Sequence, residues 1–252
     1  MERIGTVETI CRYPVKSMAG EDVAQAFVGF AGLMGDRACA FVRAPGPKGF
    51  PWHTGREQED LVLFRPHFRE GGAATLPPDI GETFKMALGV NPIFPAEDAF
   101  EIDVGTPDGR TLPLRSAELK AMIEQRAGHA VTLRFSERSL YDCRPVSLFG
   151  NASARGLGDE LAMPLDRRRF RADRPYRENE LVGRTLQIGE RLHLTILERD
   201  PRCKMITIDP DTGQTEPRIL RHVTKAHDGM AGVYAAVLVE GVVRQGDPIH
   251  LI

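Results

Sequence analysis

The sequence predicts a β-rich α+β fold, in which a smaller α/β region precedes a β-barrel. Three observations carry this prediction. Strand-like segments separated by turn residues follow one another at short intervals after residue 183, as they do in barrels. Residues 116–128 have the spacing and the end residues of a helix. The 252 residues, of which 42% are hydrophobic, are enough to bury a full core.

The first strand is predicted near the N-terminus. Residues 4–18 contain recurring β-branched residues up to Pro14, where a loop begins. Lys16 and Ser17 therefore lie in a loop at a strand end. Such loops, held by rigid strands, are where binding groups concentrate.

A second loop of this kind is predicted within residues 24–44. The sequence GLMGDR separates two strand-like runs, and Gly32 and Gly35 permit a tight turn that presents Asp36 and Arg37. Lysine, serine and arginine side chains from the two loops are together suited to bind an oxyanion.

The middle of the chain contains one predicted hairpin and one predicted helix. Residues 96–114 predict a hairpin that turns at residues 107–109. Residues 116–128 predict a helix, because Ser116 can cap it, apolar residues share one face and Gly128 ends it. A further helix is expected to start near Asn151.

The C-terminal third is predicted to be rich in strands. They are expected at residues 184–190, 191–198, 204–209, 232–241 and 247–252. We place the domains at residues 1–130 and 131–252, and the first can contribute strands to the barrel of the second. The core is expected to include Val7, Ile10, Val28, Phe41, Leu192, Leu194, Ile196, Ile206, Ile208, Val237 and Leu238.

Charge and cysteine usage exclude several classes of function. Lys and Arg number 33 against 35 for Asp and Glu, so no broad basic face is expected and nucleic acid is not a predicted partner. No apolar run is long enough to span a membrane. Four widely spaced cysteines, without a CxxC pair or a secretory signal, predict a cytoplasmic protein without an iron–sulfur cluster.

Cys203 is the sharpest candidate for chemistry. It lies between Arg202 and Lys204, and these cations favour a thiolate, which can attack, exchange disulfides or bind a soft metal. The alternative is that Cys203 is a small buried hydrophobic residue. The scattered histidines offer no spacing typical of zinc, and the usual nucleotide-binding motifs are absent from the sequence.

An arginine cluster lies within residues 167–177. Its six guanidinium groups suit a phosphate or a carboxylate, because they offer forked donors and are always charged. The alternative is a solvated surface segment whose arginines pair with neighbouring carboxylates.

Several motifs resemble the MOSC superfamily, which is named for the C-terminal domain of molybdenum cofactor sulfurase. They are YPVKS (13–17), GLMGDR (32–37), PVSLFGNAS (145–153), RRFR (168–171), VGRTLQIGE (182–190), RCKMITIDPDTG (202–213) and VRQGDPIHLI (243–252). Their order is similar to that in the mitochondrial amidoxime-reducing component and its bacterial relatives. The resemblance spans nearly the whole chain and is weakest at residues 65–115.

The resemblance implies a MOSC barrel that binds the molybdenum cofactor and reduces N-hydroxylated compounds. The site residues that it implies are Cys203 as the metal ligand, Lys16, Ser17, Arg37 and Arg171 as the cofactor cradle, and Asp209 as a proton donor or a turn residue. The thiolate of a cysteine with a low pKa suits molybdenum, and a cradle of arginines suits the phosphate of the pterin.

Two positions and one domain differ from the pattern of these relatives. Asp173 stands where an asparagine is common, and Lys204 stands where we expect an apolar residue. No ferredoxin-like domain is present in the sequence, so an enzyme would need a separate ferredoxin or flavin reductase as electron donor. Two alternatives stay open: a sulfur or cofactor carrier that uses Cys203, and a metal-free protein with an unrelated small ligand.

Overall fold

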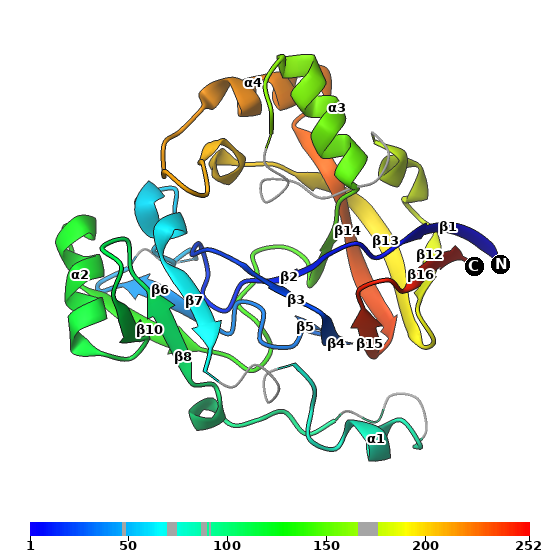
Figure 1. The fold of residues 1–252 in the computed structure, drawn as a ribbon, viewed down its shortest axis with the longest axis horizontal. Coiled ribbons are helices and arrows are strands. Elements are labelled where there is room, and N and C mark those ends of the chain that lie inside the picture. Colours follow the sequence, from blue (N-terminus) through cyan, green and yellow to red (C-terminus); the bar gives the residue numbers. More distant parts are fainter. Residues whose placement is uncertain (47–48, 70–74, 87–89, 91, 166–175) are drawn as a thin grey trace.

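The largest element of the fold is a six-stranded antiparallel sheet, in the order β1-β16-β12-β13-β14-β11. The computed structural model describes residues 1–46, 49–69, 75–86, 90, 92–165 and 176–252. The strands of this sheet are β1 (Glu2–Thr6), β11 (Val146–Leu148), β12 (Thr185–Ile188), β13 (Leu192–Pro201), β14 (Met230–Val239) and β16 (Pro248–Leu251). Because β1 pairs with β16, the two termini lie side by side (Figure 1).

The sheet confirms the β-rich prediction for the C-terminal third. β1 and β11 form its edges, and no ladder between described strands closes it into a barrel. The long strands β13 and β14 pair along nearly their whole length, with register shifts that bend them. The predicted strands at 184–190, 191–198, 232–241 and 247–252 are thereby confirmed within a few residues.

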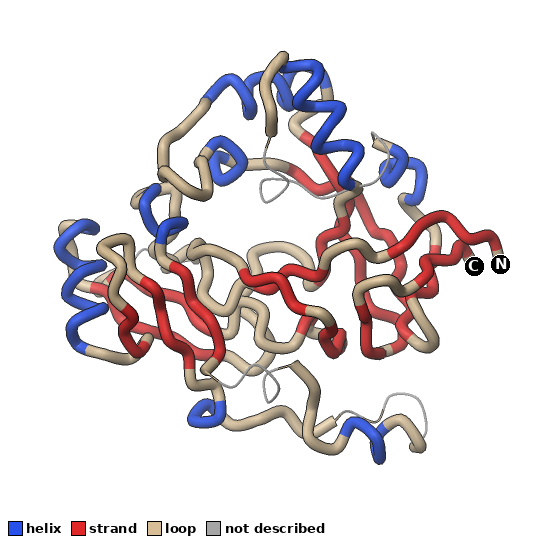
Figure 2. The backbone as a smooth tube through the Cα atoms, in the orientation of Figure 1, coloured by secondary structure: helices blue, strands red, loops and turns tan. Residues whose placement is uncertain are grey.

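Among the described residues, four smaller antiparallel sheets complete the strand structure. They are β15-β4-β5, β2-β3, β10-β6 and β7-β8-β9. Figure 2 shows the strands in red. Their bounds are β2 (Ile10–Arg12), β3 (Glu21–Val23), β4 (Gln25–Gly29), β5 (Gly32–Leu33), β6 (Cys39–Arg43), β7 (Arg65–Phe68), β8 (Ile102–Gly105), β9 (Thr111–Pro113), β10 (Val131–Phe135) and β15 (Gly241–Arg244). The predicted hairpin is thus confirmed as β8 and β9.

Pairing between distant segments joins the two halves of the chain. β15 pairs with β4, and β10 pairs with β6. N-terminal strands therefore share ladders with C-terminal ones. The domain boundary at residue 130 stays a prediction.

In the part of the chain that the structure describes, four α-helices and several 3-10 helices lie around the sheets. They are α1 (Ile80–Thr83), α2 (Ala117–Ala127), α3 (Asn151–Leu161), α4 (Pro217–Ala226), η1 (Glu59–Leu63), η2 (Glu97–Ala99), η4 (Arg177–Leu181) and η5 (Lys204–Thr207). In α2, the Ser116 side chain accepts a hydrogen bond from the Leu119 backbone N–H, and Gly128 is left-handed with φ 71°. Both helix predictions are confirmed. No helix in the described ranges is long and apolar enough to cross a membrane.

The core divides into clusters that follow the sheets. One lies among β6, β7, β8 and α2, and the second fills the face of the six-stranded sheet. Nearly all predicted core residues are buried or pack against these clusters. The prediction that Leu238 belongs to the core is wrong, since its side chain is 52% exposed. Along β14 the side chains alternate, so Leu238 faces outward next to the buried Val237.

A buried carboxyl between β14 and β15 gives a prediction about stability. Glu240 is 8% exposed, and its Oε1 atom accepts a hydrogen bond from the Phe30 backbone N–H at 3.1 Å. Burial raises the pKa of Glu240, although the Phe30 amide and the Arg191 charge act in the opposite direction. The folded protein therefore binds this proton more tightly than the unfolded chain does.

The sign of the effect follows from that difference. The carboxyl favours folding at pH values below its ordinary pKa of 4.5, and this contribution is lost as the pH rises toward the higher folded pKa. Glu240→Gln keeps the acceptor oxygen without the charge. We expect its melting temperature to exceed that of the wild type at pH 7.5 and to approach it near pH 4. Glu190→Gln, at an exposed position, is the control; an equal shift in both variants would contradict the assignment.

Candidate functional site

The candidate site is centred on Cys203, which lies between the end of β13 and the start of η5 and is partly buried. The predicted strand after this cysteine is wrong, because residues 204–207 form a 3-10 turn. The Ile206 N–H donates to the Cys203 carbonyl at 3.2 Å, and the Thr207 hydroxyl donates to the Lys204 carbonyl at 2.7 Å. Ile206 then packs into the cluster between α3 and α4. Packing of this isoleucine overrides its strand propensity.

The cation at the thiol is Arg56, which the sequence analysis missed. Its guanidinium group interacts with the Cys203 side chain and with the charge of Asp142. Burial alone would lower the pKa of Arg56, but the interactions with Cys203 and Asp142 raise it. A cation beside the thiol suits an anionic sulfur. Arg56 lies in a loop of glycine and proline without a recognisable pattern, so nothing in the sequence pointed to it.

The two cations next to Cys203 in the sequence have other partners. The Lys204 ammonium group lies 2.5 Å from Glu59 Oε1 and donates to the Arg56 carbonyl at 3.0 Å. Arg202 forms an ion pair with Asp200 at 3.1 Å. Lys204 thus links η5 to η1 and its backbone contact holds the Arg56 loop, which explains a charged residue at this position.

Lys16 is 6% exposed and lies within electrostatic range of Arg56. Its ammonium group donates to the Leu140 carbonyl at 2.8 Å and to Asp142 Oδ1 at 2.7 Å. It also lies 5.7 Å from the centre of the Trp52 ring. Burial lowers the pKa of Lys16; Asp142 opposes this shift, and the charges of Arg37 and Arg56 add to it.

Arg37 and Ser17 occupy the turns that the sequence predicts. Both residues have positive φ angles, of 47° and 66°, in the left-handed region that few side chains adopt. The Arg37 side chain forms an ion pair with Asp36 and lies 5.4 Å from the centre of the Tyr13 ring. Strain of this kind is often found at functional sites, where the surroundings hold it in place.

A buried acid lies on the other side of Arg202. Asp200 is 2% exposed and accepts a hydrogen bond from the Ser147 hydroxyl at 2.8 Å, and the Tyr234 side chain interacts with it. Burial raises the pKa of Asp200, while Arg202, the two hydroxyl donors and Arg37 counteract the shift. The same burial, together with the Asp200 charge, raises the pKa of Tyr234. Sequence reasoning missed Asp200, although it lies only three residues before Cys203.

The described structure does not bring the other two predicted site residues into this group. The Asp209 Oδ1 atom accepts hydrogen bonds from the backbone N–H groups of Asp211 and Thr212 and from the Thr212 hydroxyl, at 2.9–3.1 Å. These bonds hold the turn that follows η5. Arg171 and the neighbouring Asp173 lie outside the described residues, as does most of the arginine cluster.

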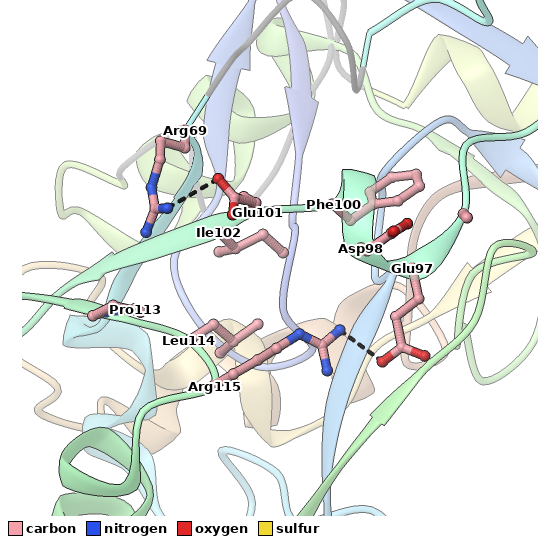
Figure 3. Close-up of a pocket in the computed structure, with 10 residues that line it drawn as sticks. Arg69, Glu97, Asp98, Phe100, Glu101, Ile102, Pro113, Leu114 and Arg115 are labelled. Carbon is pink, nitrogen blue, oxygen red and sulfur yellow. Dashed lines mark hydrogen bonds and ion pairs between the residues drawn. The ribbon is translucent and has the colours of Figure 1, made fainter.

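A cavity lies elsewhere, between η2, β8 and β9 (Figure 3). Its volume is about 640 Å³. Its two arginines already have partners: Arg69 pairs with Glu101 at 2.9 Å and Arg115 pairs with Glu97 at 2.7 Å. None of its lining residues belongs to the group around Cys203. The charges and the thiol, rather than this cavity, therefore indicate the candidate site.

The residues around Cys203 have the donors that a metal–pterin cofactor requires. A thiol sulfur is a soft ligand, and Arg56, Lys16 and Arg37 supply positive charge for an anionic group. The hydroxyl oxygen of Ser139, next to Leu140, is buried without a hydrogen-bond partner in the described part of the chain. An unpaired buried donor of this kind suits a bound polar group. The residues present therefore fit such a cofactor.

Comparisons with known proteins identify the family. The model of the MOSC domain matches residues 136–250, and the model of the MOSC N-terminal beta barrel domain matches residues 4–97. Among solved structures, YiiM from Geobacillus stearothermophilus is 16% identical with a TM-score of 0.35, over 43% of this chain and 54% of that protein. The YUAD protein from Bacillus subtilis is 10% identical with a TM-score of 0.46, over 97% of this chain and 93% of that protein. A search of curated proteins found no significant match. Since the two family models cover both halves of the sequence, the chain belongs to the MOSC family, which is associated with binding of the molybdenum cofactor.

Proposed function

We propose that this protein binds the molybdenum cofactor with Cys203 as a metal ligand and reduces N-hydroxylated compounds, such as amidoximes or hydroxylated bases. The observation that carries the proposal is the interaction of the Cys203 side chain with Arg56, which in turn lies within electrostatic range of Lys16. A lone buried structural cysteine has no need of these cations. A thiolate that binds a metal next to an anionic pterin does.

The residues of the site would have the following roles. Lys16, Ser17, Arg37 and Arg171 would hold the anionic parts of the cofactor, and Arg56 would place a positive charge beside the Cys203 side chain. When bound, the cofactor supplies a metal that accepts an oxygen atom and cycles between oxidation states. Of the two roles implied for Asp209, the turn role is favoured by its hydrogen bonds.

Asp200 is the acid that we propose for proton delivery. Its carboxyl is buried, the Ser147 hydroxyl group donates a hydrogen bond to it, and the Tyr234 side chain interacts with it. A raised pKa lets this carboxyl hold a proton at a higher pH than an exposed aspartate does. The overall reaction converts an N–OH group into N–H and water and consumes two electrons and two protons. The electrons would come from a separate ferredoxin or flavin reductase.

A carrier of sulfur or of the cofactor is the alternative function. The contact with Arg56 suits a persulfide on Cys203 as well as a metal–thiolate bond, because both are anionic sulfur. The two functions differ in what the purified protein contains. A carrier of sulfur needs no molybdenum, whereas the proposed enzyme does.

The test is the composition and the activity of the wild-type protein. The chain is produced in a host that makes the cofactor and in a matched host that does not. Molybdenum is measured by elemental analysis, the pterin by fluorescence, and Cys203 by mass spectrometry. We expect near-stoichiometric molybdenum and pterin from the first host only, and conversion of an amidoxime to the amidine with a chemically reduced dye as donor. A persulfide on Cys203 without molybdenum would instead establish the carrier.

A further inference from the structure

A second group of potential metal ligands, which does not include Cys203, lies between α3 and α4. The carboxylate of Glu160 is on α3, His222 is on α4, and His227 follows the last turn of α4. The Nε2 atoms of both histidines lie 2.7 Å from the same oxygen, Glu160 Oε2. The three ligand atoms all lie within 4.8 Å of one another. Figure 1 shows α3 and α4 next to each other at one end of the molecule.

The contacts around this group hold its side chains in place. The Tyr176 hydroxyl donates to the other carboxylate oxygen, Glu160 Oε1, at 2.9 Å. The Tyr176 ring stacks on the His227 ring, with a distance of 4.2 Å between the ring centres. One neighbour therefore fixes both the carboxylate and one imidazole. Supporting contacts of this type orient the ligands of metal sites and raise their affinity.

The helices that carry the group are themselves fixed by apolar packing. Leu157 of α3 and Ile219 and Val223 of α4 are buried in one hydrophobic cluster, which also contains Ile206 of η5. The ligands themselves are still accessible, since the side chains of Glu160, His222 and His227 are 34%, 28% and 15% exposed. An ion can reach them without unfolding of the helices.

We infer that Glu160, His222 and His227 form a binding site for a divalent transition-metal ion, with Zn²⁺ as the best match. Two imidazole nitrogens and one carboxylate oxygen are ligands that Zn²⁺ binds, and solvent can supply the fourth. Zn–N and Zn–O bonds of about 2.0–2.1 Å place tetrahedral ligand atoms ~3.4 Å apart. The Nε2–Oε2 distances of 2.7 Å need to widen by less than about 1 Å. The ion replaces the two hydrogen bonds and ties α3 to α4.

This site is independent of the proposed molybdenum chemistry. Its ligands are nitrogen and oxygen atoms, whereas the candidate molybdenum ligand is a thiol sulfur. Since α4 and η5 share the cluster around Ile206, an ion between α3 and α4 also braces the layer that carries the Cys203 segment. Its effect is therefore expected on stability, whether or not the protein contains molybdenum.

The experiment is a Zn²⁺ titration of the full chain after dialysis against a chelator. We expect micromolar or tighter affinity by calorimetry and a rise in melting temperature of about 5–10 °C at a hundredfold excess over Kd. His222→Gln and His227→Gln keep polar side chains and are each expected to weaken Zn²⁺ binding at least ~10-fold. His67→Gln, at an exposed position on β7, is the matched control and keeps wild-type affinity.

A second variant separates this site from the cysteine. Cys203→Ala is expected to keep its Zn²⁺ affinity, because its thiol is not a ligand of this site. Loss of Zn²⁺ binding in Cys203→Ala, with unchanged binding in His222→Gln and His227→Gln, would overturn the inference. So would a wild-type chain that binds no Zn²⁺ at 100 µM, on the order of a hundred times the expected Kd.

Discussion

Cys203→Ala is expected to lose at least ~10-fold of the molybdenum that the wild type retains on purification. The substitution removes the thiol that interacts with Arg56. It leaves the surrounding cations in place, so the pterin can still be attracted to the site. The measurement is molybdenum per chain by elemental analysis, with the melting temperature recorded on the same samples.

Cys11→Ala is the matched control for this prediction. Cys11 is also partly buried, and it lies on β2, next to Gly20. We expect this variant to keep both its molybdenum and its fold. If Cys203→Ala kept full molybdenum with a wild-type melting temperature, the ligand role of Cys203 would be wrong, and the family association would have to rest on cofactor contacts alone.

Much of the fold could be predicted from the sequence because local signals and packing agree there. The capped helix at 117–127 and the hairpin of β8 and β9 depend on residues that are close in sequence. The strand predicted after Cys203 was wrong because local signals and packing disagree in that segment. Its apolar residues look like a strand, but Ile206 is buried against α4, which is contributed by residues further along the chain. Nothing local indicates that contact.

The candidate site was predictable only in part, for a related reason. Lys16 and Arg37 were found because each follows a strand end in a recognisable motif. Asp142, which pairs with Lys16, and Arg56, whose charge acts on Lys16, come from loops that approach it only in the folded chain. The two cations next to Cys203, Arg202 and Lys204, are evident in the sequence. In the structure each forms an ion pair with a carboxylate. Sequence adjacency to a thiol is therefore a poor guide to which charge acts on it.

Gly32→Ala is expected to be the most destabilising of the small substitutions in this fold. Gly32 begins β5, in the GLMGDR turn that leads to Arg37, and its φ angle is 101°. A Cβ atom at this position would lie 2.4 Å from the carbonyl oxygen of Pro145. That contact is between backbone segments, and Pro145 directly precedes β11 of the six-stranded sheet. Neither backbone segment can therefore shift without a large cost in free energy.

The expected loss is about 3 kcal/mol or more in the free energy of unfolding, or a melting temperature lower by ~6–12 °C. Gly109→Ala is the control, because its φ angle is 85° but nothing lies within 4 Å of the added Cβ atom. It is expected to cost only the backbone strain, about 1–2 kcal/mol. Equal losses in the two variants would show that the φ angle alone explains the effect. A larger loss at Gly32 would establish that the close approach to Pro145 fixes the Arg37 turn against the sheet.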